Sequence, residues 1–321
     1  METQDSMPTR NFGHAGCAVQ FIGLGGAFLE AESRDAGIAA VHAAIERGVN
    51  YIDTSPGYIQ NRSQPLIGDA LKGGWRDRVV LATKLGYLTH ADDHRNVELI
   101  RKQVEDNLKL LGVDSVDVLQ VHEADMAHWW ADGAGRWERI DPTGDYDFGD
   151  APVMQVLRDA KRRGLCQYIG ITGNEARPMT RVLSEVEVDS LLLAYNFHLL
   201  RREALEAAYP LAASRGMAIV NGGVFDSGRL AQVQPDWLEQ APDWMTPRIQ
   251  KQYADLYQIA ADSNMSLIEL TLRFLLAERR LSVVLIGARF SSDIEQAVDA
   301  AARGPLDPIL HERVQSLVPA V

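Results

Sequence analysis

The stretch "AAVHAAIERGVNYIDTS", residues 39–55, contains the unit that decides the fold. Its first part has apolar side chains at three- and four-residue spacing and ends in Gly48, a pattern typical of a helix closed by a left-handed glycine. Its second part is a short apolar run that turns polar at Asp53. The stretch therefore predicts a helix that leads, within a few residues, into a buried strand with a charged end.

The same unit recurs along the chain at 100–123, 156–173 and 210–223. Each copy has a glycine where a left-handed helix cap is expected, at Gly112, Gly164 and Gly216. The predicted strands are near-continuous apolar runs, which is the pattern of a parallel sheet that is buried on both faces.

Eight strands of this kind are predicted along the chain, at 19–26, 50–55, 79–84, 116–123, 167–173, 190–196, 218–223 and 282–288. Their alternation with helices over 321 residues predicts a (β/α)8 TIM barrel with long βα loops over its C-terminal face. A doubly wound sheet is the alternative, but "GLGGAFL" at 23–29 lacks the G-x-G-x-x-G spacing of the dinucleotide motif of that fold. No linker-like change in composition occurs, so we expect residues 1–321 to form one domain.

The composition narrows the class of partner. The formal net charge is -12 and the pI is about 5.1, so the surface repels nucleic acid and anionic membranes. We expect a small-molecule substrate and no nucleic-acid or membrane partner. No signal peptide or apolar run of ~20 residues is evident, and Cys17 and Cys166 are expected to be free thiols. These features predict a cytoplasmic protein, and they leave open a monomer or a small homo-oligomer.

Polar side chains occur where three successive predicted strands end. Asp53 ends the second strand, Lys84 ends the third and His122 lies near the end of the fourth, while Tyr58 follows the second strand in its loop. Taken singly, Lys84 and Asp53 could be a structural ion pair and His122 a core histidine. Because parallel strands of a barrel bring their carboxyl ends to one rim, the joint pattern instead predicts a catalytic site.

The four side chains suit proton transfer to a carbonyl oxygen. The unperturbed pKa of tyrosine is ~10, and a neighbouring ammonium group lowers it, so we expect Lys84 to lower the pKa of Tyr58. Asp53 would hold Lys84 charged and oriented, and His122 would hydrogen-bond the reacting oxygen. These residues move only a proton, so a bound nicotinamide is expected to carry the hydride.

Two long loops follow predicted strands and are rich in aromatic residues. Residues 124–150 include Trp129 and Trp130, and residues 224–248 include Phe225. Loops of this length are uncommon in compact domains unless they have a function. We therefore assign Trp129 and Trp130 to substrate binding, through stacking on a ring or exclusion of water. The alternative is that these aromatic residues pack against the rim of the barrel.

The motifs around these residues resemble the aldo-keto reductase family over almost the whole chain. "DTSPGY", "ATK" and "LQVHE" match the family's catalytic segments, which implies catalytic roles for Asp53, Tyr58, Lys84 and His122. "YIGITGN", "AYNFHLL", "VFDSGRL" and "VVLIGAR" resemble segments that hold NAD(P)H in that family. The resemblance is greatest to the aldose 1-dehydrogenase branch, which includes enzymes of the fucose and galactose dehydrogenase type, and a related branch oxidises pyridoxal.

The resemblance implies a two-part nicotinamide site. It assigns the nicotinamide carboxamide to Thr172 and Asn174 at the end of the fifth strand, and Phe225 after the seventh strand could stack on the nicotinamide ring. Backbone amides around Ser227, Gly228 and Leu230 would meet the pyrophosphate, and Gly287, Arg289, Asp293 and Gln296 would hold the adenosine end. Asp293 falls where relatives that prefer NADPH often have an arginine for the 2′-phosphate. A carboxylate repels that phosphate, so NAD is favoured, while Arg289 keeps NADP possible. Alternatively, Asp293 is only an acidic residue at a helix N-terminus.

Two local features bear on the site. Tyr58 is followed by "IQNRSQ" and not by the family's Gly-x-Gly-x-Ser-Glu, so its loop could adopt a different position. His90 and His94 have the spacing of metal ligands, but a solvated loop is the preferred interpretation and the chemistry requires no metal.

The sequence thus predicts an NAD(P)-dependent oxidoreductase acting on a sugar or a similar small carbonyl or alcohol, with tyrosine as general acid and base. Three alternatives remain. They are a reductase of a bulkier ketone, a non-catalytic nicotinamide-binding regulatory subunit of the same fold, and a phosphate-binding (β/α)8 isomerase.

Overall fold

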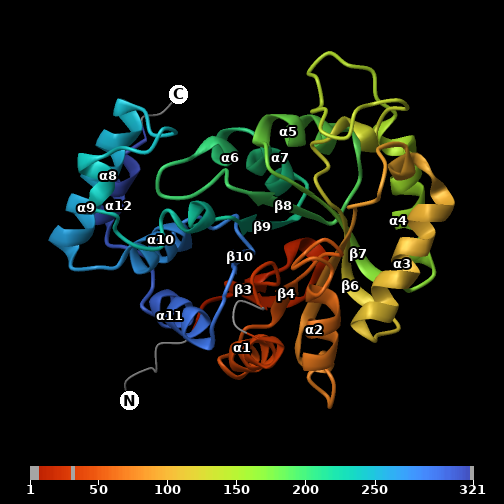
Figure 1. Cartoon of the computed structure of the whole chain (residues 1–321), viewed down its shortest axis with the longest axis horizontal. Coiled ribbons are helices and arrows are strands. Elements are labelled where there is room, and N and C mark those ends of the chain that lie inside the picture. The colour runs from red at the N-terminus through yellow and green to blue at the C-terminus, as the bar shows by residue number, and fades with distance from the viewer. Residues whose placement is uncertain (1–6, 30–32, 319–321) are drawn as a thin grey trace.

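The computed structural model describes residues 7–29 and 33–318. Eight parallel strands form a closed barrel, in which each strand pairs with the next and the last pairs with the first (Figure 1). These strands are β3 (Ile22–Gly25), β4 (Tyr51–Asp53), β5 (Val80–Leu85), β6 (Val116–Val121), β7 (Cys166–Gly173), β8 (Ser190–Ala194), β9 (Ala218–Gly222) and β10 (Val283–Ile286). The predicted (β/α)8 barrel is confirmed.

The first predicted strand is an exception, because the structure divides it in two. β2 (Ala18–Gln20) pairs antiparallel with β1 (Thr9–Asn11), and only β3 enters the barrel. Phe12, between the strands of this hairpin, is buried with its ring centroid 5.6 Å from those of Tyr51 and Tyr168 inside the barrel. The hairpin therefore closes the N-terminal end of the barrel, a role that the apolar run at 19–26 did not reveal.

Helices surround the barrel on its outside (Figure 1). The α-helices are α1 (Arg34–Glu46), α2 (Ser63–Ala70), α3 (Val97–Leu111), α4 (Pro152–Arg162), α5 (Ala176–Glu185), α6 (Glu203–Glu206), α7 (Ala208–Ser214), α8 (Asp236–Glu239), α9 (Pro247–Ser263), α10 (Leu267–Leu276), α11 (Ser291–Ala302) and α12 (Pro308–Gln315). The expected left-handed glycines are confirmed, with φ between 64° and 90° at Gly48, Gly112, Gly164 and Gly216. Within the described residues, no helix is both long and apolar enough to span a membrane.

Short 3-10 helices occur in the connections. They are η1 (Gly13–Ala15), η2 (Arg76–Arg78), η3 (Asp92–Arg95), η4 (Ala127–Trp129), η5 (Phe148–Asp150) and η6 (Asp226–Gly228). The long loop after β6 contains η4 and η5, and the one after β9 contains η6 and α8. Both predicted excursions therefore begin at the carboxyl ends of barrel strands, which is the rim where TIM-barrel active sites lie.

The inside of the barrel changes from apolar to polar along the strand direction. Its lower part is a cluster of apolar side chains that includes Tyr51, Val80 and Val118. Near the carboxyl ends, buried polar side chains replace them, among them Asp53 and Lys84. The strands therefore place polar groups at the C-terminal rim, on top of an apolar floor.

Candidate active site

Lys84 joins the predicted residues at the rim of the barrel. Its ammonium group forms an ion pair with Asp53, and both side chains are almost completely buried. Lys84 Nζ also donates to the carbonyl oxygen of Thr54 at 3.0 Å and to the hydroxyl oxygen of Tyr58 at 3.2 Å. An ammonium group has three hydrogens. The three acceptors therefore use all of them, and one is the phenolic oxygen.

Gln120 supports the same carboxylate from the next strand. Its Nε2 donates to Asp53 Oδ1 at 3.1 Å, and it lies opposite Lys84 in the pairing of β5 with β6. We did not predict Gln120 from the sequence. A signal existed, because Gln120 lies two residues before His122 and alternate residues of a strand point to the same side.

His122 is held on two sides. Its Nδ1 lies 2.9 Å from the hydroxyl oxygen of Ser55, and its carbonyl oxygen accepts from Nε1 of Trp129 at 2.8 Å. Its ring lies edge-on to that of Tyr58, with 5.6 Å between the centroids. Burial, aided by the positive charge of Lys84, holds the pKa of His122 well below its ordinary value. The imidazole is therefore neutral at neutral pH.

The expected lowering of the tyrosine pKa is wrong for this structure. Burial raises the pKa of Tyr58 well above its ordinary value, and the negative charges of nearby groups, Asp53 foremost, add to the effect. The desolvation of the phenolate thus outweighs the hydrogen bond from Lys84. Burial likewise raises the pKa of Asp53 and lowers that of Lys84, while the opposite charge of each partner counteracts these shifts.

The loop that carries Tyr58 reaches Lys84 despite its unusual sequence. Ile59, Gln60 and Asn61 all adopt left-handed backbone conformations, with φ of 52°, 54° and 70°. This conformation costs roughly 1–2 kcal/mol per non-glycine residue. Gln64 is buried and donates from Nε2 to Thr83 Oγ1 at 2.9 Å. The loop therefore keeps a backbone geometry that suits glycine, although this chain has none at these positions.

The two tryptophans assigned to substrate binding lie in the protein interior. Trp129 and Trp130 have no exposed surface, and Trp130 Nε1 donates to the carbonyl oxygen of Ala124 at 2.7 Å. Neither indole therefore presents an open face to a ligand in this structure. Both side chains pack against the rim of the barrel, as the alternative interpretation expected. Trp129 instead supports the backbone of His122, which its position in the sequence alone did not indicate.

His94 also differs from the prediction for its loop. It is buried, with its ring centroid 4.1 Å from that of His128 and 4.6 Å from that of Trp129. Its Nδ1 lies 3.0 Å from the carbonyl oxygens of His90 and Ala91. The ring therefore packs beneath the rim and is not part of a solvated loop. Among residues 7–29 and 33–318, no group of three side chains is arranged to hold a metal ion.

Tyr87 is an aromatic residue at the rim that sequence reasoning missed. Its ring is about half exposed and lies edge-on to His122, with 4.8 Å between the centroids. A Cβ added at Gly57 would be 2.4 Å from this ring, so the glycine before Tyr58 makes room for it. Burial and the charge of Glu123 raise the pKa of Tyr87 to about 12. A signal was its position just beyond Lys84, at the end of a barrel strand.

The residues predicted at the nicotinamide end lie beside His122 and Glu123. Thr172 Oγ1 accepts from the backbone nitrogen of Glu123 at 3.2 Å. Asn174 donates from its side chain to Glu123 Oε1 at 3.3 Å and from its backbone to Asp125 Oδ2 at 3.0 Å. The structure therefore brings Thr172 and Asn174 to the same part of the rim as His122.

The loop after β9 differs in detail from the expectation that its amides are free for a pyrophosphate. The backbone nitrogens of Gly228 and Leu230 both donate to the carbonyl oxygen of Phe225, at 2.9 and 3.0 Å. Phe225 is partly buried against the core, and Ser227 has a left-handed φ of 56°. Gly228 is also left-handed, and no atom lies within 4 Å of a Cβ added there. The loop thus leaves open space beside Gly228.

The predicted adenosine end lies at the start of α11. Asp293 Oδ2 accepts from the backbone nitrogens of Arg289 at 2.8 Å and Phe290 at 3.1 Å, so it caps this helix. Asp293 therefore makes the contacts expected of an acidic residue at a helix N-terminus, which was the alternative interpretation of this residue. Gly287 and Gln296 are exposed nearby. The guanidinium of Arg289 is also exposed, and within the described ranges no partner accepts from it.

This donor set suits a dinucleotide. It provides an amide side chain at Asn174, open space beside Gly228 and an exposed guanidinium at Arg289. The residues lie on the same rim as Tyr58, because all of them follow barrel strands.

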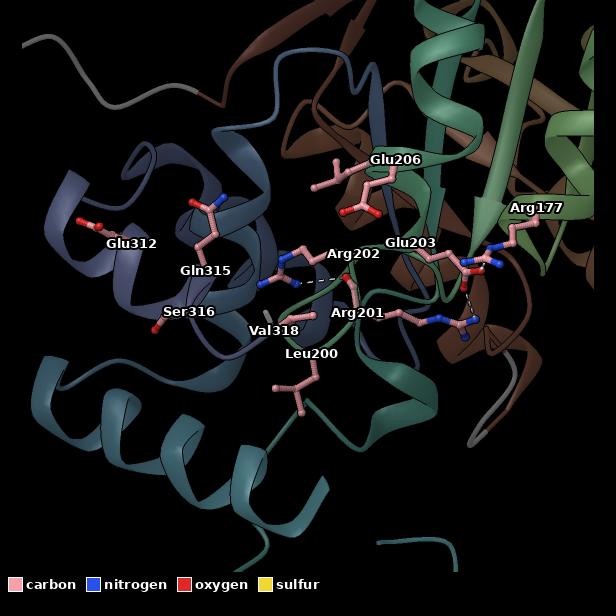
Figure 2. Close-up of a pocket in the computed structure, with 11 residues that line it drawn as sticks. Arg177, Leu200, Arg201, Arg202, Glu203, Glu206, Glu312, Gln315, Ser316 and Val318 are labelled. Atoms are coloured by element: carbon pink, nitrogen blue, oxygen red, sulfur yellow. Dashed lines mark hydrogen bonds and ion pairs between the residues drawn. The ribbon is translucent and has the colours of Figure 1, made fainter. Parts of the chain in front are cut away.

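A cavity of about 690 Å³ lies elsewhere, between the segment after β8 and helix α12 (Figure 2). None of the four predicted catalytic residues lines it. Figure 2 shows Arg177 and Arg201 directed at Glu203, with which they pair at 3.5 and 2.9 Å. Because these charges satisfy each other, and because the cavity lies apart from Tyr58 and Lys84, we do not regard it as the catalytic site.

Comparison with known proteins agrees with this geometry. The model of the Aldo/keto reductase family matches residues 21–319. L-galactose dehydrogenase of Arabidopsis thaliana is 25% identical, over 91% of this chain and 87% of its own. D-threo-aldose 1-dehydrogenase of a Pseudomonas species and pyridoxal 4-dehydrogenase of Microbacterium luteolum are each 26% identical, over 90% of this chain and 91% of their own.

A solved structure has the same fold. The aldo-keto reductase AKR11C1 from Bacillus halodurans, in its holo form, aligns with a TM-score of 0.76 at 23% identity, over 98% of this chain and 97% of its own. The match of the family model over almost the whole chain agrees with the closed barrel and with the side chains gathered at its rim. The chain therefore belongs to the aldo/keto reductase family and is an oxidoreductase.

Proposed function

We propose that this oxidoreductase moves a hydride between NAD(P) and a sugar or a similar small carbonyl or alcohol, with Tyr58 as general acid and base. The hydrogen bond from Lys84 Nζ to the Tyr58 hydroxyl oxygen, at 3.2 Å, carries the proposal. A hydroxyl that accepts from an ammonium group keeps its own hydrogen for another partner. Tyr58 can therefore donate this proton to a substrate oxygen, or accept one with Lys84 stabilising the phenolate.

His122 positions the substrate oxygen in this proposal. Its pKa lies well below the ordinary value, so the ring is a neutral donor and not a second acid. The Ser55 hydroxyl lies 2.9 Å from Nδ1. If that hydroxyl donates to Nδ1, the ring hydrogen is on Nε2, where it can hydrogen-bond an oxygen shared with Tyr58. The edge-on arrangement of the two rings, 5.6 Å apart, supports a common target.

The raised pKa of Tyr58 favours the neutral phenol as the resting form. A neutral phenol is ready to protonate a carbonyl oxygen during reduction. During oxidation, the same group must accept a proton, and the ammonium of Lys84 is the positive charge that contacts its oxygen. The residues therefore support both directions, and the physiological direction is left open.

A nicotinamide, when bound, supplies or takes up the hydride. We propose that Thr172 and Asn174 bind its carboxamide end and that Phe225 lies beside its ring. The loop at Ser227, Gly228 and Leu230 would border the pyrophosphate, and Gly287, Arg289, Asp293 and Gln296 would bind the adenosine end. We favour NAD, because the carboxylate of Asp293 at the start of α11 would repel a 2′-phosphate.

The relatives support a small polar substrate. They are named as dehydrogenases of L-galactose, of D-threo-aldoses and of pyridoxal. The burial of Trp129 and Trp130 weakens the argument for a bulkier ketone, which depended on their faces being open. A net charge of -12 also favours a small soluble substrate over nucleic acid. We further propose that the protein is cytoplasmic.

The test is turnover with NAD or NADP and a panel of aldoses and simple aldehydes, followed at the absorbance band of reduced nicotinamide. Tyr58→Phe should lower kcat by roughly 10²- to 10⁴-fold, the usual contribution of a general acid or base. Tyr146→Phe is the matched control, because Tyr146 lies in the long loop after β6 and its hydroxyl accepts from the backbone of Asp141.

The alternatives predict different results in the same assay. Nucleotide binding without turnover of any substrate would support a regulatory subunit. Turnover that survives Tyr58→Phe would contradict the assignment of the acid and base.

A further inference from the structure

Glu123 combines an unusual backbone with a position next to His122. Its φ is 52°, a left-handed conformation that is rare for residues other than glycine. Other non-glycine residues in the loops after barrel strands share this feature, among them Tyr87 after β5 and Tyr195 after β8, with φ of 58° and 65°. Backbone strain of this kind clusters at active sites and ligand-binding segments. Glu123 is therefore held at the rim at a cost in conformational energy.

The carboxylate of Glu123 has little compensation from the protein. Its Oε1 accepts one hydrogen bond, from Asn174 Nδ2 at 3.3 Å, and within the described ranges no cation forms an ion pair with it. Burial and the charge of Asp125 raise the pKa of Glu123, and Arg139, the first of the two arginines whose charges oppose this rise, is itself paired with Asp125 and Glu175. An ionised carboxylate can accept about four hydrogen bonds. Most of the acceptor capacity of Glu123 is therefore unused, although the side chain is partly buried.

Glu123 also lies close enough to the reacting groups to affect them. Its negative charge raises the pKa of both Tyr58 and Tyr87. Its backbone nitrogen donates to Thr172 Oγ1 at 3.2 Å, and this residue is one that we assign to the nicotinamide end. Glu123 thus lies next to His122 in the chain and contacts Thr172 and Asn174, so we place the substrate beside its carboxylate.

We infer that Glu123 is a specificity-determining residue that accepts a hydrogen bond from a substrate hydroxyl adjacent to the reacting carbon. This inference rests on the proposed function and names a substrate class, molecules with a hydroxyl beside the carbonyl or alcohol that reacts. The hydroxyl groups of a polyhydroxylated substrate can donate the hydrogen bonds that the Glu123 carboxylate does not receive from the protein. An apolar ketone would leave a partly desolvated carboxylate without a partner, and such a mismatch is a strong basis for rejection.

The experiment compares an aldose with its 2-deoxy analogue in the wild type, Glu123→Gln and Glu175→Gln. The readout is the ratio of kcat/KM for the two substrates. The ratio is required because loss of the Glu123 charge also changes the pKa of Tyr58, and that effect acts on both substrates alike. Glu175 is the matched control, because it is an acidic residue near the same rim that already pairs with Arg139 at 3.2 Å.

We expect Glu123→Gln to lower kcat/KM for the aldose by about 10- to 100-fold, the range for a hydrogen bond to a charged group, and to leave the 2-deoxy analogue within about 3-fold. The preference for the aldose should then disappear, while Glu175→Gln retains it. Glutamine is nearly isosteric with glutamate, and an unchanged thermal midpoint would show that the variant folds.

Three outcomes would overturn the inference. An equal loss for both substrates would make Glu123 a structural residue, while the dependence of turnover on Tyr58 would leave the proposed function intact. Loss of the preference in Glu175→Gln as well would show a general effect of charge at the rim. Absence of wild-type turnover with the aldose, its analogue and simple aldehydes would overturn both the inference and the proposed function.

Discussion

Replacement of Lys84 by methionine tests whether the buried charges at the rim depend on one another. The two side chains have similar length, so Lys84→Met creates little empty space. It removes the ion pair with Asp53 and the hydrogen bonds to Thr54 and Tyr58. Among the residues that the structure describes, Asp53 then keeps one side-chain donor, Gln120 Nε2 at 3.1 Å.

The structure sets the size of the effect. The side chains of Lys84 and Asp53 are only 1% and 3% exposed, so water cannot replace the lost ammonium. Removing one partner of a buried ion pair costs about 3–5 kcal/mol in the free energy of unfolding. Lys72→Met is the control, because the pair of Lys72 and Asp69 is exposed at 74% and 43%. Loss of such a surface pair should change the free energy by less than about 1 kcal/mol.

The cost should also depend on pH. Burial already raises the pKa of Asp53, and the charge of Lys84 opposes that rise, so Lys84→Met should raise the pKa further. A carboxyl group with a pKa higher in the folded than in the unfolded chain destabilises the fold once pH exceeds the unfolded value of ~3.9. The difference in stability between wild type and variant should therefore be largest at neutral pH. It should shrink as pH falls toward ~4, because Asp53 of the folded variant is then protonated and no longer a buried unpaired charge.

Urea denaturation at pH 7.5 and at pH 5, followed by circular dichroism, measures this difference. The double variant Asp53→Asn/Lys84→Met removes both charges and should recover most of the lost stability. A loss below about 1 kcal/mol for Lys84→Met at pH 7.5, no larger than that of Lys72→Met, would refute the reasoning. So would a loss that is the same at both pH values.

Three further predictions concern other parts of the site. Trp129→Phe removes the hydrogen bond to the His122 carbonyl oxygen and leaves a small cavity, so the free energy of unfolding in urea should fall by about 1–3 kcal/mol and kcat should be lower. Wild-type values for both quantities would contradict a supporting role for Trp129. Asp293→Asn keeps an acceptor for the amides at the start of α11 but removes the charge, so the ratio of kcat/KM for NADP to that for NAD should rise, and an unchanged ratio would count against our assignment of NAD. Burial lowers the pKa of His128 to about 4, so the stability that this residue contributes is present above the unfolded pKa of ~6.5 and is lost as pH falls toward 4. His128→Gln should therefore flatten the pH dependence of the thermal midpoint between these two pH values, and an unaltered slope would argue against the mechanism.

The sequence by itself determined the barrel and the residues at its mouth. Helix periodicity, the glycine after each helix and the apolar strands are local signals, and each operates over about ten residues. Once eight βα units are recognised, the rules of parallel topology bring all strand ends to one rim. The convergence of Asp53, Lys84 and His122, with Tyr58 beside them, could therefore be anticipated before any coordinates were known.

Only the tertiary structure decided how these residues interact and which of their neighbours matter. Gln120, Ser55 and Trp129 support Asp53 and His122 through contacts between separate segments, and no local pattern encodes such contacts. The direction of the Tyr58 pKa was likewise mispredicted, because it depends on how completely the surrounding chain excludes water. The unpaired carboxylate of Glu123 is visible only when the partners of Arg139 are known. Desolvation and charge pairing depend on the packed interior of the folded protein. The sequence therefore predicts which residues form the site, but only the tertiary structure determines their pKa shifts and interactions.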